Sequence, residues 1–167
     1  SKVEKLSKSA NLSESVYNQA VKLGEAGKIQ ESLNLLNQIK GNYAKAKTLY
    51  DSMNSFHKKV SLWLGTWKHR GTVNGEKTTY YITFSEVLYK GEPCIKIKDM
   101  NNKSLGYDVE ISSKNHITQI EVGKYMIHFK LKNNHNQKLT YTLLEGKKML
   151  RELKYEGVTY KTKYKKK

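Results

Sequence analysis

The sequence contains little cysteine, little proline and little arginine, and it lacks a long hydrophobic run. Cys94 is the one cysteine, so an internal disulfide and a cysteine-rich metal site are both excluded. No stretch approaches the roughly 18 consecutive apolar residues of a membrane span, so we expect no transmembrane segment in this chain. Hydrophobic residues still make up 37% of the 167 residues, which is enough for a modest core and excludes wholesale disorder.

Positive charge is the dominant compositional feature. The chain has 31 lysines and arginines against 15 acidic residues, a formal net charge of +16. Such a surface attracts nucleic acid, anionic lipid headgroups or anionic polymers. Arg70 and Arg151 are the only arginines, however, whereas surfaces that read bases or clamp phosphates usually rely on the planar guanidinium. Two interpretations stay open: a functional anionic partner, and a lysine-rich composition that reflects an AT-rich coding sequence.

Residues 11 to about 60 have the spacing of amphipathic helices. Apolar residues recur at steps of three and four, and we expect about three helices with Ser13 as the first N-cap. Gly24 and Gly27 bracket one break, and Gly41 begins the next. The chain starts at Ser1 rather than at a methionine, so we expect it to be a fragment of a longer or processed protein.

The segment from Ala20 to Leu36 resembles a tetratricopeptide repeat. The matching positions are Ala20, Leu23, Gly27, Ile29, Ser32 and Leu36. The resemblance covers about one repeat and a following helix, without the family's terminal proline and with Ile39 in place of a small residue. It implies a helical unit over residues 1–60, which is either a structural hairpin or a protein-docking surface.

From Ser61 onward the hydrophobic period changes to two, which is typical of strands. We expect nine strands, separated by turn residues, in a second domain over residues 61–167. The expected strands are 62–73, 78–88, 94–99, 104–112, 115–122, 124–132, 137–144, 148–155 and 157–164.

Three hairpins predict their own registers, because each places bulky residues on one side and polar residues on the other. The expected pairs are Trp67–Ile82, Gly65–Phe84 and His69–Tyr80; Val122–Tyr125, Ile120–Ile127 and Thr118–Phe129; and Tyr155–Val158, Leu153–Tyr160 and Glu152–Lys161. These registers favour an antiparallel meander with one apolar face. We therefore predict an α+β protein whose sheet closes as an up-and-down barrel of eight or nine strands.

The triplet Gly65-Thr66-Trp67 resembles the G-x-W signature of lipocalins and the wider calycin barrels. In that superfamily an arginine from a late strand covers the tryptophan ring at the closed end of the barrel. The resemblance implies that Gly65, Trp67 and Arg151 form such a structural closure here. The chain departs from the lipocalin pattern by a shorter barrel, by the absence of the middle T-D-Y motif and by a ninth strand in place of a helix.

The sequence carries no pattern for catalysis or for a resident metal or cofactor. The five histidines have no spacing that places two on one strand face or one helical turn, and no nucleophile elbow or glycine-rich phosphate loop is present. We expect Cys94 to be an inert buried side chain. The chain is therefore expected not to be an enzyme and to hold no cofactor.

The barrel interior is the expected binding site, and it is either filled by side chains or open to a small amphipathic ligand. The candidate ligand-binding residues are Tyr80, Tyr107, Tyr125, Tyr141 and His69. A hydrogen-bonded core histidine is the alternative for His69. The basic residues that alternate on the other face are Lys68, Arg70, Lys96, Lys98, Lys130, Lys132, Lys161 and Lys163. They either keep the sheet soluble or form a polyanion-binding surface, and the inward tyrosines argue against base stacking.

Three functional hypotheses follow. The first is a binding module for a small amphipathic ligand or an anionic surface polymer, in the extracytoplasmic part of a lipoprotein or membrane-anchored protein of a Gram-positive-type bacterium. The second is a scaffold with a filled barrel that docks partners through its helices. The third is nucleic-acid binding through lysines, which predicts strong salt dependence.

Overall fold

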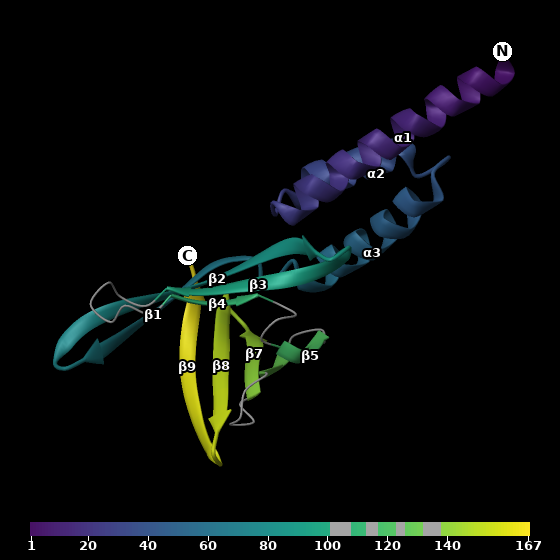
Figure 1. The fold of residues 1–167 in the computed structure, drawn as a ribbon. Helices are drawn as coiled ribbons and strands as arrows, with labels where there is room; N and C mark the ends of the chain where they lie inside the picture. Colours follow the sequence, from purple (N-terminus) through teal and green to yellow (C-terminus); the bar gives the residue numbers. More distant parts are fainter. Residues whose placement is uncertain (101–107, 113–116, 123–125, 132–137) are drawn as a thin grey trace. The chain divides into compact units, whose positions relative to one another are not determined.

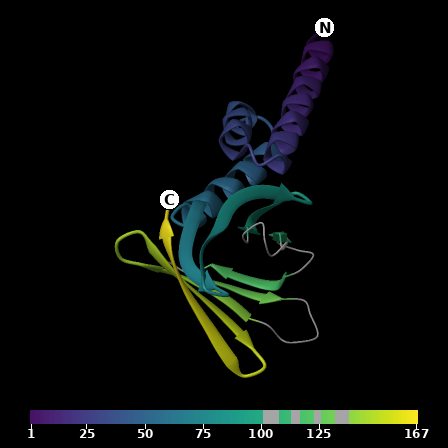
Figure 2. The same ribbon diagram turned by 90° about the vertical axis from the view of Figure 1, so that its left-hand side faces the viewer.

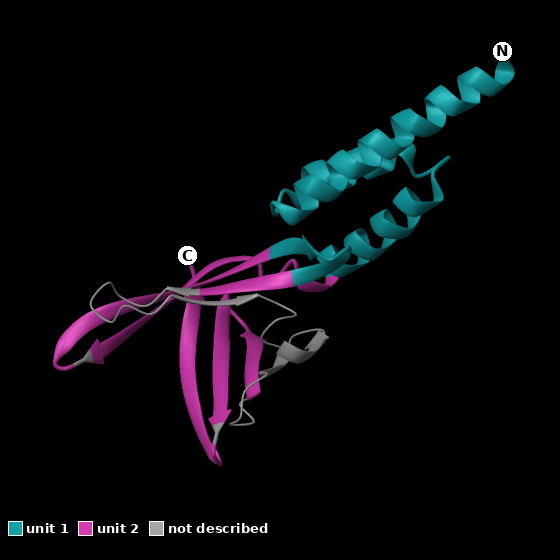
Figure 3. Ribbon diagram, viewed as in Figure 1, with its two compact units in different colours: residues 1–58, 86–94 teal, residues 59–85, 95–167 magenta. Residues whose placement is uncertain are grey.

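The computed structural model describes residues 1–100, 108–112, 117–122, 126–131 and 138–167. Over these residues the protein is α+β, as predicted, with three helices followed by an antiparallel sheet (Figure 1). Two compact units are present, residues 1–58 with 86–94 and residues 59–85 with 95–167 (Figure 3). The first unit thus joins a strand segment to the helices, whereas the predicted division at residue 60 assigns that segment to the sheet.

The three helices are α1 (Lys2–Glu25), α2 (Ile29–Ile39) and α3 (Ala44–Val60). The prediction of Ser13 as the first N-cap was wrong: α1 begins with a capping box in which the Ser1 hydroxyl accepts from the Glu4 amide and Glu4 reaches back to the N-terminus. Ser13 is buried inside the helix instead. Gly27, at a φ of +79°, makes the turn into α2, a conformation that glycine adopts without steric cost.

The core of the first unit lies among the predicted apolar positions of the helices and one strand residue. Its buried members are Ala20, Ile29, Leu33, Leu36, Ile39, Ala46, Leu49, Met53 and Leu88. The Ser32 hydroxyl donates to the carbonyl of Ala20 at 2.7 Å, so this small side chain satisfies its hydrogen bond within the α1–α2 contact. Leu88 comes from the strand segment 86–94, which is why that segment belongs to the helical unit.

The described strands are β1 (Gly65–Val73), β2 (Glu76–Tyr89), β3 (Glu92–Met100), β4 (Asp108–Ser112), β5 (Ile117–Val122), β6 (Met126–Leu131), β7 (Lys138–Leu144), β8 (Lys148–Tyr155) and β9 (Val158–Lys166). Their order in the sheet is β4-β3-β2-β1-β9-β8-β7-β6-β5. The six strands β1–β3 and β7–β9 form a curled sheet like half a barrel (Figure 2). The closed barrel of eight or nine strands stays a prediction.

Two of the three predicted hairpin registers are confirmed. In β1–β2, Gly65, Trp67 and His69 lie opposite Phe84, Ile82 and Tyr80, across a turn in which Asn74 and Gly75 both have positive φ. The β8–β9 pairs are also those expected from a turn at Glu156-Gly157. The β5–β6 register was wrong by two residues: Val122 pairs with Ile127 and Ile120 with Phe129. A shift of two keeps every residue on its predicted face, so the alternating pattern alone cannot distinguish the two registers.

One face of the sheet is buried and apolar. Its fully or nearly fully buried residues include Trp67, Ile82, Phe84, Leu139, Tyr141, Met149 and Tyr164. The rings of Phe84 on β2 and Tyr141 on β7 meet edge to face, with centroids 5.1 Å apart. Because β1, β9 and β8 lie between those strands in the sheet order, this contact requires the sheet to curl around its apolar face.

Candidate functional site

The predicted ligand-binding residues occupy different environments on the buried face. His69 stacks on Tyr80 with ring centroids 6.0 Å apart and also lies beside Tyr164, at 5.8 Å. The His69 Nδ1 atom is 2.8 Å from the carbonyl oxygen of Lys163, to which it donates. Tyr141 is almost fully buried against Phe84. Tyr107 and Tyr125 lie outside the described residues.

The structure places Trp67 in a closed, hydrogen-bonded environment. The indole is 2% exposed and its Nε1 donates to the Trp63 carbonyl at 2.8 Å. Gly65 has a φ of +107°, which explains why glycine precedes the tryptophan by two residues. Arg151 lies on β8 opposite Tyr141 and Thr162, on the same face of the sheet as the predicted closure, and its contact with the indole stays a prediction.

Lys166 is a cation at the tryptophan that the sequence analysis missed. Its ammonium nitrogen lies 5.1 Å from the Trp67 ring centroid and donates to the Leu62 carbonyl at 3.1 Å. Desolvation, with a smaller effect of the Lys147 charge, lowers the pKa of Lys166 below its usual value. The alternation of side chains along β9 could have indicated this position. Lys166 is two residues from the buried Tyr164 and therefore lies on the same face of the strand.

A pair of a half-buried histidine and a buried carboxylate in the first unit was also missed. His57 Nδ1 on α3 lies 2.5 Å from a carboxylate oxygen of Glu86 on β2, and the Glu86 side chain is 5% exposed. Burial raises the pKa of Glu86, and the hydrogen bond and charge of His57 oppose that shift. Glu86 stands between Phe84 and Leu88 in the series of alternate residues that face the core. A carboxylate at such a position could have indicated a buried charged group. Among the described residues no three His, Cys, Asp or Glu side chains gather as a metal site.

The opposite face of the sheet carries many basic residues. By strand alternation it comprises the exposed-side positions of β8, β9, β1 and β2, which we call the cationic face. Its basic residues are Lys148, Lys154, Lys161, Lys163, Lys165, Lys68, Arg70 and Lys77, and we add Lys167, which directly follows β9. The acidic residue on these described positions is Glu152, 3.6 Å from the Lys161 ammonium. Lys68, Arg70, Lys161 and Lys163 were predicted to lie on this side.

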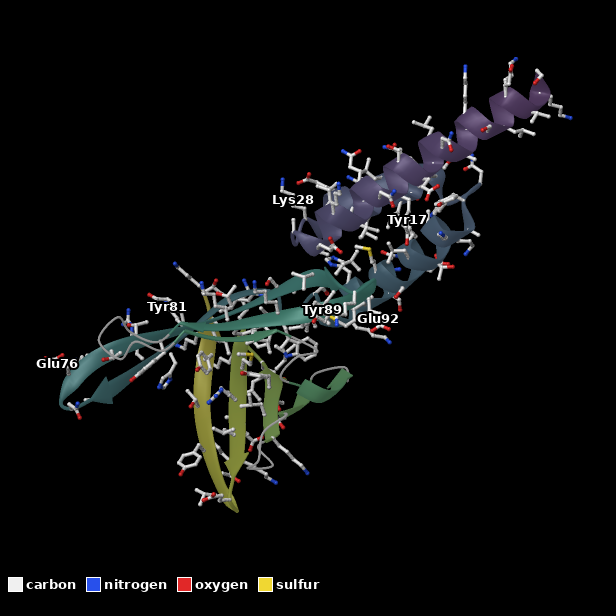
Figure 4. All side chains as sticks on the ribbon, in the orientation of Figure 1. Tyr17, Lys28, Glu76, Tyr81, Tyr89 and Glu92 are labelled. Atoms are coloured by element: carbon white, nitrogen blue, oxygen red, sulfur yellow. The ribbon has the colours of Figure 1, made fainter. Side chains whose placement is uncertain are left out.

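Three lysines of the cationic face stand side by side on adjacent strands. Lys148 on β8 pairs with Lys165 on β9, and Lys165 pairs in turn with Lys68 on β1. We call these three residues the lysine row. Directly opposed residues have Cβ atoms about 5 Å apart, and like charges in that position destabilise a sheet. The row ends at Tyr81 on β2, whose ring lies 5.6 Å from the Lys167 ammonium (Figure 4).

Protection of a sheet edge does not account for these lysines. Strand β9 lies between β1 and β8 and pairs with both, so it has no free edge to block. A further pair of like charges lies across β7 and β8, where Lys138 is opposite Lys154. The arrangement concentrates positive charge at the middle of a sheet, where an anion lying across the strands would offset the repulsion.

Comparisons of the chain with protein-family models, with curated proteins and with solved structures find no match. None of the described helices combines the length and the apolar character that crossing a bilayer requires.

Proposed function

We propose that the chain is a non-enzymatic binding module that holds a linear anionic polymer on its cationic face. The lysine row carries this proposal. Lys148, Lys165 and Lys68 repel one another on neighbouring strands, and a polyanion lying across them offsets that repulsion. Along β9, alternate residues add lysines about 6.7 Å apart, so one polymer chain can contact several ammonium groups.

Two features favour a polymer over a small ligand held inside the sheet. The described rings of the buried face contact one another, as Phe84 and Tyr141 do, which supports the filled interior among the alternatives. His69 already has a hydrogen-bond acceptor in the Lys163 carbonyl, which supports its role as a core histidine. On this proposal, the calycin-like barrel and the tetratricopeptide-like helices serve as scaffold, and the helices keep the second role of protein docking.

The cationic face suits a flexible anionic polymer better than nucleic acid. Single-stranded nucleic acid generally binds where aromatic rings stack on successive bases. Within the second unit, Tyr81 is the aromatic residue at the described cationic-face positions, and its ring neighbours a lysine. Lysine also contributes a point charge rather than the bidentate fork that reads bases, which favours a partner recognised by charge and spacing.

The test compares polymer binding by the wild type with binding by Lys68→Gln/Lys148→Gln/Lys165→Gln. Fluorescence anisotropy with labelled poly(glycerol phosphate), a linear phosphodiester polymer, is measured from low to moderate salt. The slope of log affinity against log salt should fall in magnitude by about two, since each lost contact removes roughly 0.7 for a flexible chain. The matched control, Lys5→Gln/Lys8→Gln/Lys22→Gln on exposed positions of α1, removes the same charge and should change the slope by much less.

Equal effects of the two triple variants would contradict the proposal, because attraction would then depend on net charge alone. A thirty-nucleotide oligothymidylate serves as the competitor. Displacement of the polymer by equimolar phosphate groups of this oligonucleotide, with higher affinity, would replace the proposal by nucleic-acid binding.

A further inference from the structure

The β1–β2 hairpin carries a pocket whose chemistry differs from the rest of the cationic face. The pocket has a volume of about 460 Å³. Its lining residues are Arg70, Gly71, Thr72, Lys77, Thr78 and Thr79. Arg70, Thr72, Lys77 and Thr79 share one face of the hairpin, whereas the side chain of Thr78 is buried on the other face. The open face thus combines one guanidinium, one ammonium and two hydroxyl groups with no carboxylate.

The strand register places the two cations of this pocket diagonally across the hairpin. Arg70 lies opposite Thr79 and Thr72 lies opposite Lys77, so each cation faces a threonine. Diagonal positions on an antiparallel pair are about 7–8 Å apart, which leaves room for an anion between two long side chains. Glu76, at the end of the hairpin, precedes Lys77 and so belongs to the other face of β2 (Figure 4).

The identity of the first cation is informative. Among 31 basic residues the chain has two arginines, and the other, Arg151, lies on β8 opposite the buried Tyr141. A guanidinium donates two parallel hydrogen bonds to one oxyanion group, which a lysine cannot do. Arg70 therefore provides directional recognition in a surface that otherwise attracts anions by charge.

The local backbone separates this part of the hairpin from the neighbouring strand. The register between β1 and β9 comprises Trp67–Lys166 and Lys68–Lys165, and at the next residue the His69 side chain takes the Lys163 carbonyl as its acceptor. Beyond that point the hairpin continues past the β1–β9 pairing (Figure 1). Arg70 is the first residue of this continuation, so a ligand can approach the pocket beside the lysine row.

We propose that this pocket binds a phosphomonoester group, which deepens the proposed function by naming the chemical group that the module recognises specifically. Two cations match the charge of a phosphomonoester, between one and two negative charges at neutral pH, and the threonine hydroxyls can donate to its three terminal oxygens. A carboxylate would leave one cation without a counter-charge. The group belongs either to the end of the anionic polymer or to a free small molecule, and both sources offer the same chemistry.

Isothermal titration with phenyl phosphate tests the pocket without the polymer. The wild type should bind phenyl phosphate saturably, and Arg70→Gln should lower the affinity about ten-fold or more, since charge-assisted hydrogen bonds are lost. Arg70→Lys keeps the charge and should recover only part of the affinity, because the fork is absent. The control, Lys154→Gln, removes one charge from the cationic face outside the pocket and should leave the affinity within about two-fold.

The absence of saturable binding, or equal losses of affinity in Arg70→Gln and Lys154→Gln, would overturn the proposal that this pocket binds a phosphomonoester. A second measurement separates the two sources of the phosphoryl group. Poly(glycerol phosphate) with a terminal phosphomonoester is compared with the same polymer after phosphatase treatment: preference for the first identifies the polymer end, and equal affinity identifies a free phosphomonoester. Binding of phenyl phosphate without any binding of the polymer would refute the proposed function and leave the pocket standing.

Discussion

The contact between Gly24 and Leu88 gives the most direct test of the helical unit. Gly24 is buried in the last turn of α1, and Leu88 belongs to the strand segment that completes the helical core. A Cβ atom built on Gly24 would lie 2.4 Å from Cδ1 and 2.7 Å from Cγ of Leu88. These distances are far below van der Waals contact, so Gly24→Ala forces the leucine or the backbone to move.

The expected energies follow from two opposing effects of Gly24→Ala. Overpacking of a core generally costs about 1–3 kcal/mol, whereas replacing glycine by alanine inside a helix gains about 1 kcal/mol. The net change should therefore be a loss of roughly 0–2 kcal/mol in the free energy of unfolding. Leu88→Ala by itself should cost about 2–5 kcal/mol, because it leaves a cavity among the helices.

The double variant distinguishes a real contact from two independent effects. Once Leu88 is alanine, the contacts with Cδ1 and Cγ are gone and a close approach of 3.3 Å to Cβ remains. Gly24→Ala should then be less destabilising than in the wild type, and at most stabilising by about 1 kcal/mol. Urea denaturation followed by circular dichroism at 222 nm measures all four proteins of the cycle. The same effect of Gly24→Ala in both backgrounds would refute the packing of segment 86–94 on α1.

The two remaining predictions concern the buried carboxylate and the glycine before the tryptophan. The pKa of Glu86 is raised above its ordinary 4.5, so its contribution to stability is full below pH 4.5 and is lost as pH rises through the folded-state value. Glu86→Gln should weaken the pH dependence of the free energy of unfolding in urea over that pH range, and it should be the more stable protein above it. An unchanged pH profile would count against the burial of this group. Gly65→Ala should cost about 1–3 kcal/mol at a φ of +107°, whereas Gly41→Ala, with open space around it, should stay within about 0.5 kcal/mol; similar values for both would contradict the positive φ.

Local features of this protein follow directly from its sequence. The change of hydrophobic period near residue 61 predicts helices before strands, and the Asn74-Gly75 and Glu156-Gly157 turns predict two registers to the residue. The third register failed because alternation repeats every two residues, so a loop two residues longer preserves the same pattern. Short-range rules thus work where the turn chemistry is strong.

The candidate sites depend on neighbours that are distant in the sequence. Lys148, Lys165 and Lys68 become a row only because the last strand pairs with the first, a contact that no local pattern encodes. The burial of Glu86 against His57 likewise requires a strand segment to join the helical core.

The sequence by itself determined the class of each segment, the buried and exposed faces of its strands and the excess of positive charge. Tertiary structure alone decided that Lys165 adjoins Lys68 and which cation lies over Trp67. The reason is physical. Periodicity and turns act over a few residues, whereas strand pairing and core packing are selected by the free energy of the whole fold.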